Sequence, residues 1–360
     1  MAKKRLLFIF FLLILISAYL VPNMLAHYKK EEPDLQRVNN ITVSSNKEKV
    51  DLIILKIAHY FPESHPQHIA LVQKFIPLVE EGSNWKIRVE VYPNSQLGGE
   101  KEYIQGVRNG TIEMGIGGQS LAELLPGFKV IEFPYLFSSY DEAKRILNSD
   151  IGNKATEGLD ALGVYSLAWS LNGFRQISTY DKSSKELESQ GNNKIATTFS
   201  TENAEALKVI GFDAVPTHVE EMSITLKQKA VDGHDNPPLL SYYNGWYETQ
   251  KYIFITNHII SPTMYLVGEK FWTSLPEEYK VLIKNASKET ADYETELLKD
   301  AEKDIFNTLK SKGVEMEYPD IAAYKEEIMP LYDKWASNNT MRDLLDEIIS
   351  EKEKLDNHSN

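Results

Sequence analysis

Arg175 is the only arginine between Arg145 and Arg342, a stretch in which lysine supplies the other basic side chains apart from histidine. It follows an apolar run and a glycine in the segment Trp169-Ser-Leu-Asn-Gly-Phe-Arg-Gln176. A guanidinium is a rigid planar fork of donors that binds a carboxylate through two parallel hydrogen bonds, which an ammonium cannot do. Arg175 is therefore our first candidate for binding a small anion. The alternative is an ordinary ion pair, since structural ion pairs resemble functional ones.

A second polar segment, Val231-Asp-Gly-His-Asp-Asn-Pro237, begins with a predicted short strand at residues 231–233 and continues as a polar turn. Asp232 and Asn236 are candidates for contacting a ligand. The same Asp-Gly and Asn-Pro pairs are also common turn formers without any function. Taken alone, the segment favours the turn, and the two interpretations stay open.

Three histidines raise the question of a metal site. His65 and His68 lie three residues apart on a predicted helix, and His59 ends the strand before it. Glu63 is the only carboxylate near them, and the set does not match the usual zinc ligand spacings. We therefore expect no metal and no cofactor.

Enzyme signatures do not appear in the chain. It has no cysteine, which excludes disulfides, thiolate metal sites and cysteine nucleophiles. It also has no P-loop, no GxGxxG segment and no hydrolase nucleophile elbow. We predict no catalytic residues, and we expect that the protein is not an enzyme.

The charge balance argues against nucleic acid as a partner. The formal net charge is −13 at pH 7, and residues 1–30 contain basic residues but no acidic one. The rest of the chain is therefore more acidic still. Such a surface repels nucleic acid and anionic lipid.

The N-terminus has the pattern of an export signal. Lys3-Lys4-Arg5 precedes an apolar run, Leu6–Val21, in which Ser17 is the only polar member. This length suits a signal peptide core, and the preceding positive charge keeps that end in the cytoplasm. We predict a signal peptide or an uncleaved signal anchor at 1–26, a flexible tether at 27–50 and an extracytoplasmic body at 51–360. The chain would touch the membrane through its N-terminal segment if that segment is not cleaved.

Hydrophobic periodicity predicts an α/β body. Strands and helices alternate from residue 50 to residue 116, and further short strands alternate with helices up to residue 265. A long helical pattern covers 276–312, and two more helices follow at 324–349. We expect two α/β lobes, the first at about 51–172 and 262–302 and the second at about 173–261 and 303–350.

Several of these segments, taken in order, carry a resemblance to a known family. They are Leu55-Lys-Ile-Ala-His59, Val91-Tyr-Pro-Asn-Ser-Gln-Leu-Gly-Gly-Glu100, Gly110-Thr-Ile-Glu-Met114, Phe133-Pro-Tyr-Leu-Phe137, Asn172-Gly-Phe-Arg-Gln176, Val231-Asp-Gly-His-Asp-Asn-Pro237, Tyr247-Glu-Thr-Gln-Lys-Tyr252 and Thr256-Asn-His258. Together they resemble the substrate-binding proteins of tripartite ATP-independent periplasmic (TRAP) transporters, of the DctP type.

The resemblance implies a two-lobed fold like that of type II periplasmic binding proteins, with a long helix crossing both lobes and a helical C-terminus. It also implies a periplasmic or cell-surface protein that captures a small organic acid, possibly a C4-dicarboxylate, and delivers it to membrane permease subunits. A membrane-anchored sensory partner of a histidine kinase is the alternative function. A secreted enzyme on the same scaffold is a weaker one.

One position departs from the family pattern. The family usually has a second arginine on the strand after the lobe crossover, and this chain has Ala196 there. Three outcomes stay open: Arg175 holds the carboxylate alone, the ligand has another charge, or the protein has become a sensor. We favour the first, with help from Asn236 and from the hydroxyls of Thr197 and Thr198.

The resemblance also implies a set of further residues lining the ligand cleft. For Trp169 and Phe199, packing in the core is an almost equal alternative. The full set of expected ligand-binding residues is Arg175, Asn236, Gln119, Trp169, Thr197, Phe199, Tyr60 and Glu100.

Overall fold

The computed structural model describes residues 52–359, apart from residue 123 and residues 184–185 and 187–192. The predicted signal segment and tether at 1–50 lie outside the described residues. Within the described part of the chain, none of the helices combines the length and apolar content needed to cross a bilayer.

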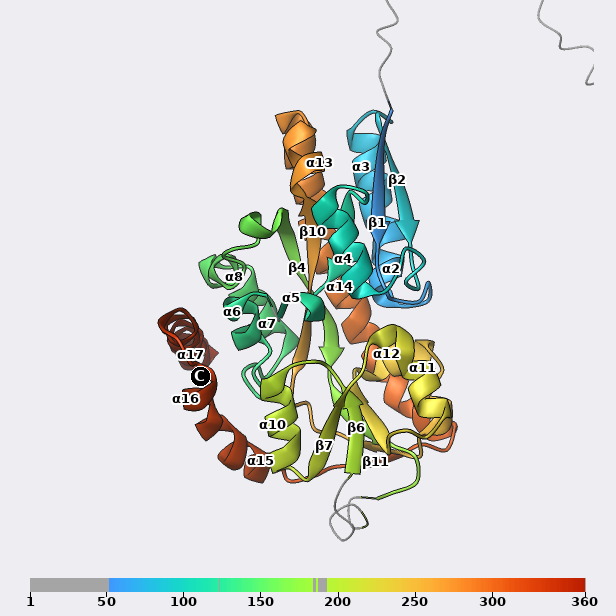
Figure 1. Ribbon diagram of the computed structural model, residues 1–360, viewed down its shortest axis with the longest axis vertical. Helices are drawn as coiled ribbons and strands as arrows, with labels where there is room; N and C mark the ends of the chain where they lie inside the picture. The colour runs from blue at the N-terminus through green and yellow to red at the C-terminus, as the bar shows by residue number, and fades with distance from the viewer. Residues whose placement is uncertain (1–51, 123, 184–185, 187–192, 360) are drawn as a thin grey trace, which may run out of the picture. The chain divides into compact units, whose positions relative to one another are not determined.

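The first sheet contains five strands in the order β2-β1-β3-β10-β4 (Figure 1). Its strands are β1 (Ile53–Ala58), β2 (Ile87–Tyr92), β3 (Met114–Gly117), β4 (Val164–Phe174) and β10 (Ile260–Gly268). β1 pairs in parallel with β2 and β3, whereas β10 runs antiparallel to β3 and β4. In β1, Leu55 and Ile57 are buried, whereas Ile54 is 36% exposed.

The helix predicted after β1 forms, with one irregularity. It begins as α2 (Pro66–Ala70), passes through a π-helical turn at Leu71–Phe75 and continues as α3 (Ile76–Gly82). Pro77 has no backbone N–H and its ring would collide with the preceding turn of an α-helix. The π-helical turn just before Pro77 widens the backbone there and lets the helix continue.

Short helices complete the first lobe: α4 (Glu100–Asn109), α5 (Gln119–Ala122), α6 (Pro126–Ile131), α7 (Tyr140–Leu147), α8 (Asp150–Ala155), a 3-10 turn η3 (Asp160–Leu162) and α13 (Glu269–Ser274). Ser139 caps α7, because its hydroxyl accepts a hydrogen bond from the backbone N–H of Glu142. α4 ends at Gly110, whose φ of 75° suits glycine.

The second sheet contains six strands in the order β11-β9-β5-β8-β6-β7. They are β5 (Gln176–Thr179), β6 (Asn193–Thr197), β7 (Phe212–Pro216), β8 (Gly233–Asn236), β9 (Tyr252–Phe254) and β11 (Glu315–Glu317). Its helices and turns are α10 (Thr201–Val209), α11 (Val219–Lys227), α12 (Pro238–Tyr243) and the 3-10 turn η4 (Trp246–Thr249). A small apolar cluster that includes Ile177, Ile195 and Leu207 forms a core of its own in this lobe.

The predicted position of the strand within residues 231–237 was wrong. The strand begins at Gly233 and ends at Asn236, so the polar residues lie within a buried strand and not in a turn after it. β8 pairs with β5 on one side and with β6 on the other. A central strand with polar side chains is stable here because Asp235 has several hydrogen-bond partners, described below.

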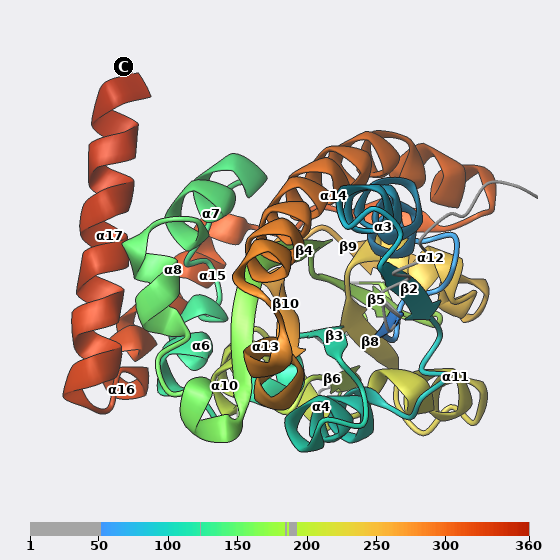
Figure 2. The same ribbon diagram turned by 90° about the horizontal axis from the view of Figure 1, so that it is seen from above.

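The chain passes between the two sheets where β4 leads into β5 and where β9 leads towards β10. The 35-residue helix α14 (Glu277–Ser311) packs against α2 and β4 of the first lobe and against α12 and β11 of the second (Figures 1 and 2). The chain then continues through α15 (Ile321–Ile328), a 3-10 turn at Met329–Leu331, α16 (Tyr332–Trp335) and α17 (Asn339–Ser359). The predicted two lobes, long helix and helical C-terminus are confirmed.

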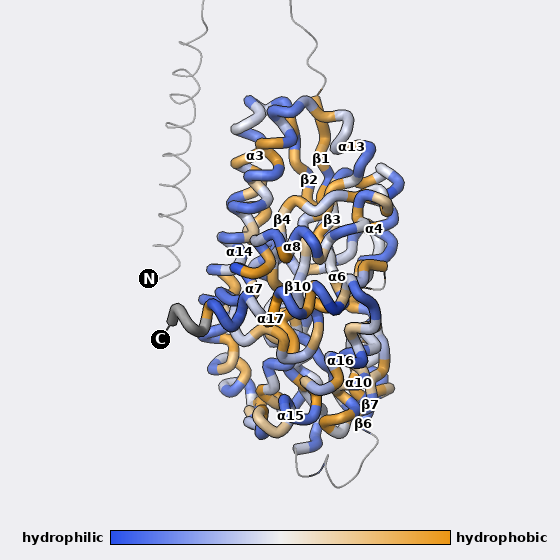
Figure 3. The backbone as a smooth tube through the Cα atoms, turned by 90° about the vertical axis from the view of Figure 1, so that its left-hand side faces the viewer, coloured by the Kyte–Doolittle hydropathy of each residue, from blue (hydrophilic) through white to orange (hydrophobic). Residues whose placement is uncertain are grey.

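The hydropathy of the backbone follows this arrangement. Figure 3 shows β1 coloured mostly as hydrophobic, whereas α3 alternates between hydrophilic and hydrophobic residues along its length. That alternation is typical of a helix with one face in the core and one in water.

Candidate ligand-binding site

Arg175 forms a buried ion pair with Asp235. Its Nε lies 2.9 Å from Asp235 Oδ1, and the two side chains are 2% and 0% exposed. Nη2 donates a hydrogen bond to the backbone carbonyl of Asp235 and lies 3.4 Å from Oδ1 of Asn236. One edge of the guanidinium fork is therefore occupied from within the protein.

Asp235 accepts hydrogen bonds from two further side chains and lies close to a third. Thr197 Oγ1 donates to its Oδ2 at 2.6 Å and Asn203 Nδ2 donates to the same oxygen at 2.8 Å. His258 Nε2 lies 3.1 Å from Oδ1. Burial opposes ionisation of this carboxyl, but Arg175 and His258 outweigh it and hold its pKa well below the ordinary range. Asp235 is thus a fixed negative charge that orients Arg175.

Arg175, Asp235 and the residues that hydrogen-bond around them form a buried polar frame. Gln176 and the segment 256–258 complete this frame. Gln176 Oε1 accepts hydrogen bonds from the backbone N–H groups of Thr256 and Asn257, at 2.8 and 3.0 Å. The backbone N–H of Tyr135 donates to the carbonyl of His258 at 2.6 Å. Four of the sequence segments that carried the resemblance therefore meet at this place, since Arg175, Asp235, His258 and Tyr135 each belong to a different one.

Two buried donors at this frame remain unused. Within the described part of the chain, Nη1 of Arg175 and Nδ2 of Asn236 are buried and have no hydrogen-bond partner. Arg175 directly precedes β5, and Asn236 of β8 is paired with Gln176, the first residue of β5. Buried donors without a partner are costly. A ligand oxygen that accepts from both would remove that cost.

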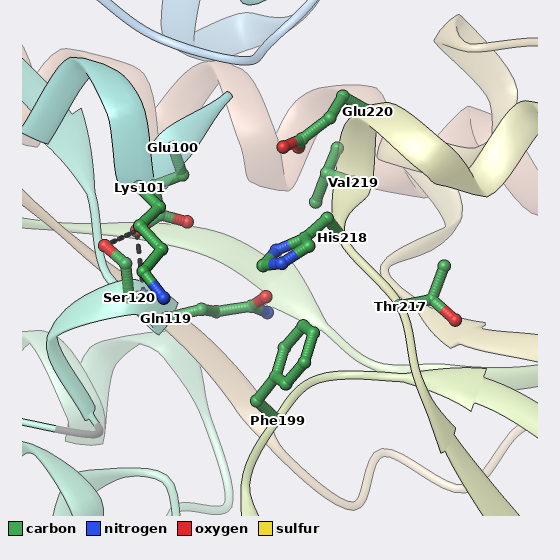
Figure 4. Close-up of a pocket in the computed structure, with 9 residues that line it drawn as sticks. All are labelled: Glu100, Lys101, Gln119, Ser120, Phe199, Thr217, His218, Val219 and Glu220. Carbon is green, nitrogen blue, oxygen red and sulfur yellow. Dashed lines mark hydrogen bonds between the residues drawn. The ribbon is translucent and has the colours of Figure 1, made fainter. Parts of the chain in front are cut away.

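Two cavities open between the lobes, and the second reaches Thr198, which directly follows Thr197, a hydrogen-bond partner of Asp235. The first has a volume of about 80 Å³ and the second of about 130 Å³, and both are lined by Gln119 and Phe199. Residues of α4 and α5 line the first cavity from one lobe, and the segment before α11 lines it from the other. Figure 4 shows Gln119 and Lys101 on one side and Phe199 and His218 on the other. The rings of Phe199 and His218 lie 4.4 Å apart between centroids.

The predicted residues occupy different depths of the site. Gln119, Phe199 and Glu100 line the cavities directly. Arg175, Asn236, Thr197 and Tyr60 are buried. Trp169 lies elsewhere: it stacks on Phe128 at 5.6 Å and lines a separate cavity of about 400 Å³ beside α14.

Tyr60 is buried and is influenced by charges of both the frame and the cavities. Burial raises the pKa of its hydroxyl well above the ordinary value, and the charge of Glu100 adds to this while Arg175 opposes it. Tyr60 therefore lies within electrostatic reach of residues in both places.

Glu100 holds the start of α5 against the start of α4. Its Oε1 accepts hydrogen bonds from the backbone N–H of Gly118, from the backbone N–H of Ser120 and from the Ser120 hydroxyl, at 2.8, 3.1 and 2.9 Å. Figure 4 shows the contact with Ser120. Glu100 therefore shapes the cavity wall as much as it lines it.

Several cavity residues were not predicted from the sequence. Among them are Lys101, Ser120, Lys129, Glu132, His218 and Glu220. Lys101 and Ser120 each follow a predicted site residue directly, which was the available signal. The others have no distinctive local pattern.

Ala196 and the three histidines each make contacts within the protein. Ala196 is fully buried in the main apolar cluster, opposite His234 and Val215. His59 Nε2 lies 3.2 Å from His68 Nδ1, and His65 accepts a hydrogen bond from the backbone N–H of Gln67. Among the described residues, no group of three acidic, histidine or cysteine side chains is arranged to hold a metal ion.

Comparison with known proteins identifies the family. The model of "Bacterial extracellular solute-binding protein, family 7", named DctP, matches residues 57–339. The chain belongs to this family. The matched span contains all the residues of the site and both sheets except the start of β1, so the predicted membership among TRAP solute-binding proteins of the DctP type is confirmed.

A solved structure shows the same fold. A TRAP periplasmic solute-binding protein from Haemophilus influenzae with bound L-gulonate is 33% identical to this DctP-family protein, with a TM-score of 0.78. The match covers 83% of this chain and 99% of that one. The family is one of extracytoplasmic transport proteins, in agreement with the predicted location and with the prediction of a binding protein.

Two curated relatives match a similar part of the chain. The 2,3-diketo-L-gulonate-binding periplasmic protein YiaO of Escherichia coli is 27% identical, over 73% of this chain and 80% of YiaO. The C4-dicarboxylate-binding periplasmic protein DctP of Rhodobacter capsulatus is 28% identical, over 79% of this chain and 86% of that protein.

Proposed function

We propose that this DctP-family protein captures a small sugar acid outside the cytoplasm and delivers it to TRAP permease subunits. The observation that carries the proposal is the pair of unused buried donors, Arg175 Nη1 and Asn236 Nδ2. A carboxylate oxygen accepts hydrogen bonds and gains from a charged donor. Both donors therefore match the one group that all organic acids share.

A sugar acid fits the site better than a dicarboxylate. Arg175 is the only arginine at the described site, and Asp235 already occupies one edge of its fork. Amide and hydroxyl groups line the cavities, among them Gln119, Ser120 and Thr198. These groups suit the hydroxyls of a sugar acid. The relatives with bound or named gulonate compounds support the same choice.

We further propose that the N-terminal apolar run, Leu6–Val21, exports the body or anchors it outside the membrane. For the lobe boundaries we propose residues 51–172 and 262–302 for the first lobe and residues 173–261 and 303–350 for the second. The passages from β4 to β5 and from β9 to β10 would serve as the connections that flex when the lobes close.

A thermal-shift screen tests the proposed function. The purified body, residues 51–360, would be heated with aldonates, uronates, C4-dicarboxylates and the neutral sugars of matching size. A ligand that binds only the folded state raises the melting temperature. We expect a shift with at least one sugar acid and none with its neutral sugar. Equal shifts with the neutral sugar, or shifts with dicarboxylates alone, would contradict the proposal.

A further inference from the structure

Glu132 has an unusual position in the second cavity. It follows α6 directly and its side chain is 5% exposed. It lines the cavity together with Lys129, Thr198 and Gln119. Within the described residues its carboxyl group makes no hydrogen bond or ion pair, so the group is buried, polar and directed at the space that a ligand would fill.

Charged groups of both signs surround Glu132, and Arg175 has the largest effect of them on its carboxyl. Glu100, Glu202 and Asp235 act on it from α4, α10 and β8, and each disfavours a further negative charge. Arg175 acts in the opposite sense. Its guanidinium, however, is already engaged by Asp235.

The remaining groups facing this carboxyl add little charge that would act on its ionisation. Tyr60 lies within electrostatic range and is uncharged at neutral pH, because burial raises the pKa of its hydroxyl well above 10.0. Lys129 lines the same cavity and is partly exposed to solvent. Solvent screens a charge at such a place.

The protonation state of Glu132 follows from this setting. Burial raises the pKa of the carboxyl to about 8, and Glu100 adds to the increase. The group is then mostly neutral at pH 7. A neutral carboxyl has an O–H donor that an ionised one lacks.

We propose that protonated Glu132 donates a hydrogen bond to the ligand and thereby completes the site that accepts an acid. This rests on the proposed function. It would be a third donor, in addition to Arg175 Nη1 and Asn236 Nδ2, and the proton stays on Glu132 or is shared with the ligand oxygen. An ionised Glu132 would repel the same anion, so binding above the titration range must take up one proton.

Calorimetric titration between pH 6 and pH 9.5 tests this proposal with the acid that gives the largest thermal shift. For the wild type we expect constant affinity at the acidic end and a fall approaching tenfold per pH unit above the titration range. Titrations at pH 9 in buffers of different ionisation heat should show the uptake of about one proton per ligand.

Glu132→Gln is the informative variant, because an amide keeps a donor and cannot titrate. It should bind within a few-fold of the wild type at pH 6.5 and lose the fall in affinity at high pH. Glu202→Gln is the matched control, since Glu202 lines the same cavity but is less buried. That variant should keep the fall.

Three results would overturn the role of Glu132 while leaving the proposed function intact. They are affinity that rises with pH, a Glu132→Gln variant with the wild-type pH profile, or loss of binding by Glu132→Gln at pH 6.5. The last result would mean that the carboxyl accepts a hydrogen bond from the ligand. Failure of the wild type to bind any acid at pH 6.5 would instead contradict the proposed function itself.

Discussion

Asp235 holds Arg175 so that two of its three guanidinium nitrogens face the protein and the third, Nη1, has no partner among the described residues. The ion pair and the candidate binding contact are thus two parts of one arrangement. Sequence reasoning had treated an ion pair and an anion site as alternatives for Arg175. The structure places an ion pair on one edge of the fork, and the proposed ligand would bind at the other edge.

The ion pair should be important for stability. Asp235→Asn leaves the Arg175 guanidinium buried without a balancing charge, and breaking a buried pair in this way costs about 3–5 kcal/mol. Urea unfolding of the body would measure the loss. The exposed pair of Lys303 and Asp300 provides the control, because both side chains are 73% exposed. Asp300→Asn should change the free energy of unfolding by less than about 0.5 kcal/mol.

A double variant separates the charge from the packing. If the uncompensated guanidinium is the cause, Arg175→Met combined with Asp235→Asn should be less destabilised than the sum of the two single changes. Additive losses would show that the two side chains contribute independently, contrary to the arrangement described.

Phe199 should matter for binding and little for folding. Its ring is 42% exposed and borders both cavities. Phe199→Ala should weaken ligand binding about tenfold, a loss of about 1.4 kcal/mol of contact with the ligand. The free energy of unfolding should fall by less than about 1 kcal/mol, because the ring is not part of the core.

Trp169→Ala is the opposite case. Trp169 is 9% exposed and stacks on Phe128, so its removal should cost about 3–5 kcal/mol of stability. The variant protein that remains folded should bind the ligand within a few-fold of the wild type. Calorimetry with both variants would show whether the two effects divide in this way or whether each residue affects both properties.

The body should become less stable as the pH rises through neutrality. Burial raises the pKa of Glu294 to about 8, from an ordinary value of 4.5. The folded state therefore keeps a proton that the unfolded chain has already lost between these two values. Stability from this group is complete below the ordinary value and is lost as the pH rises towards 8, at about 1.4 kcal/mol per pH unit.

Glu294→Gln isolates this contribution. Glu294 lies on α14, where it accepts a hydrogen bond from the Ser170 hydroxyl at 2.9 Å. Urea unfolding at several values between pH 5.5 and pH 8 should give a shallower decline for the variant than for the wild type. Parallel declines would contradict the assignment of a raised pKa to this carboxyl.

Much of the fold could be predicted because local patterns and tertiary packing agree. The helix from His65 to Glu81 shows its apolar spacing clearly, and the long α14 does the same. The strand β8 could not be placed correctly, because Asp235 and Asn236 have the composition of a turn. Only their partners Arg175, Thr197 and Asn203, distant in the sequence, make a buried strand possible there.

The site could be predicted only in part for the same reason. Arg175 was detected because arginine is rare in its region, and Gln119 through the family resemblance. Glu132 gave no local signal, since it is one acidic residue in an acidic chain. Its proposed role depends on burial in the second cavity and on a carboxyl group without a hydrogen bond or ion pair among the described residues. Neither property is encoded by its neighbours in the sequence.

A crystal structure of the body with the sugar acid that gives the largest thermal shift tests the central claim most directly. We expect a carboxylate oxygen about 3 Å from both Arg175 Nη1 and Asn236 Nδ2, between Gln119 and Phe199. The ion pair of Arg175 and Asp235 should remain intact in that complex. A carboxylate bound away from Arg175, for example beside Lys284 and Lys288 in the cavity next to Trp169, would contradict the account.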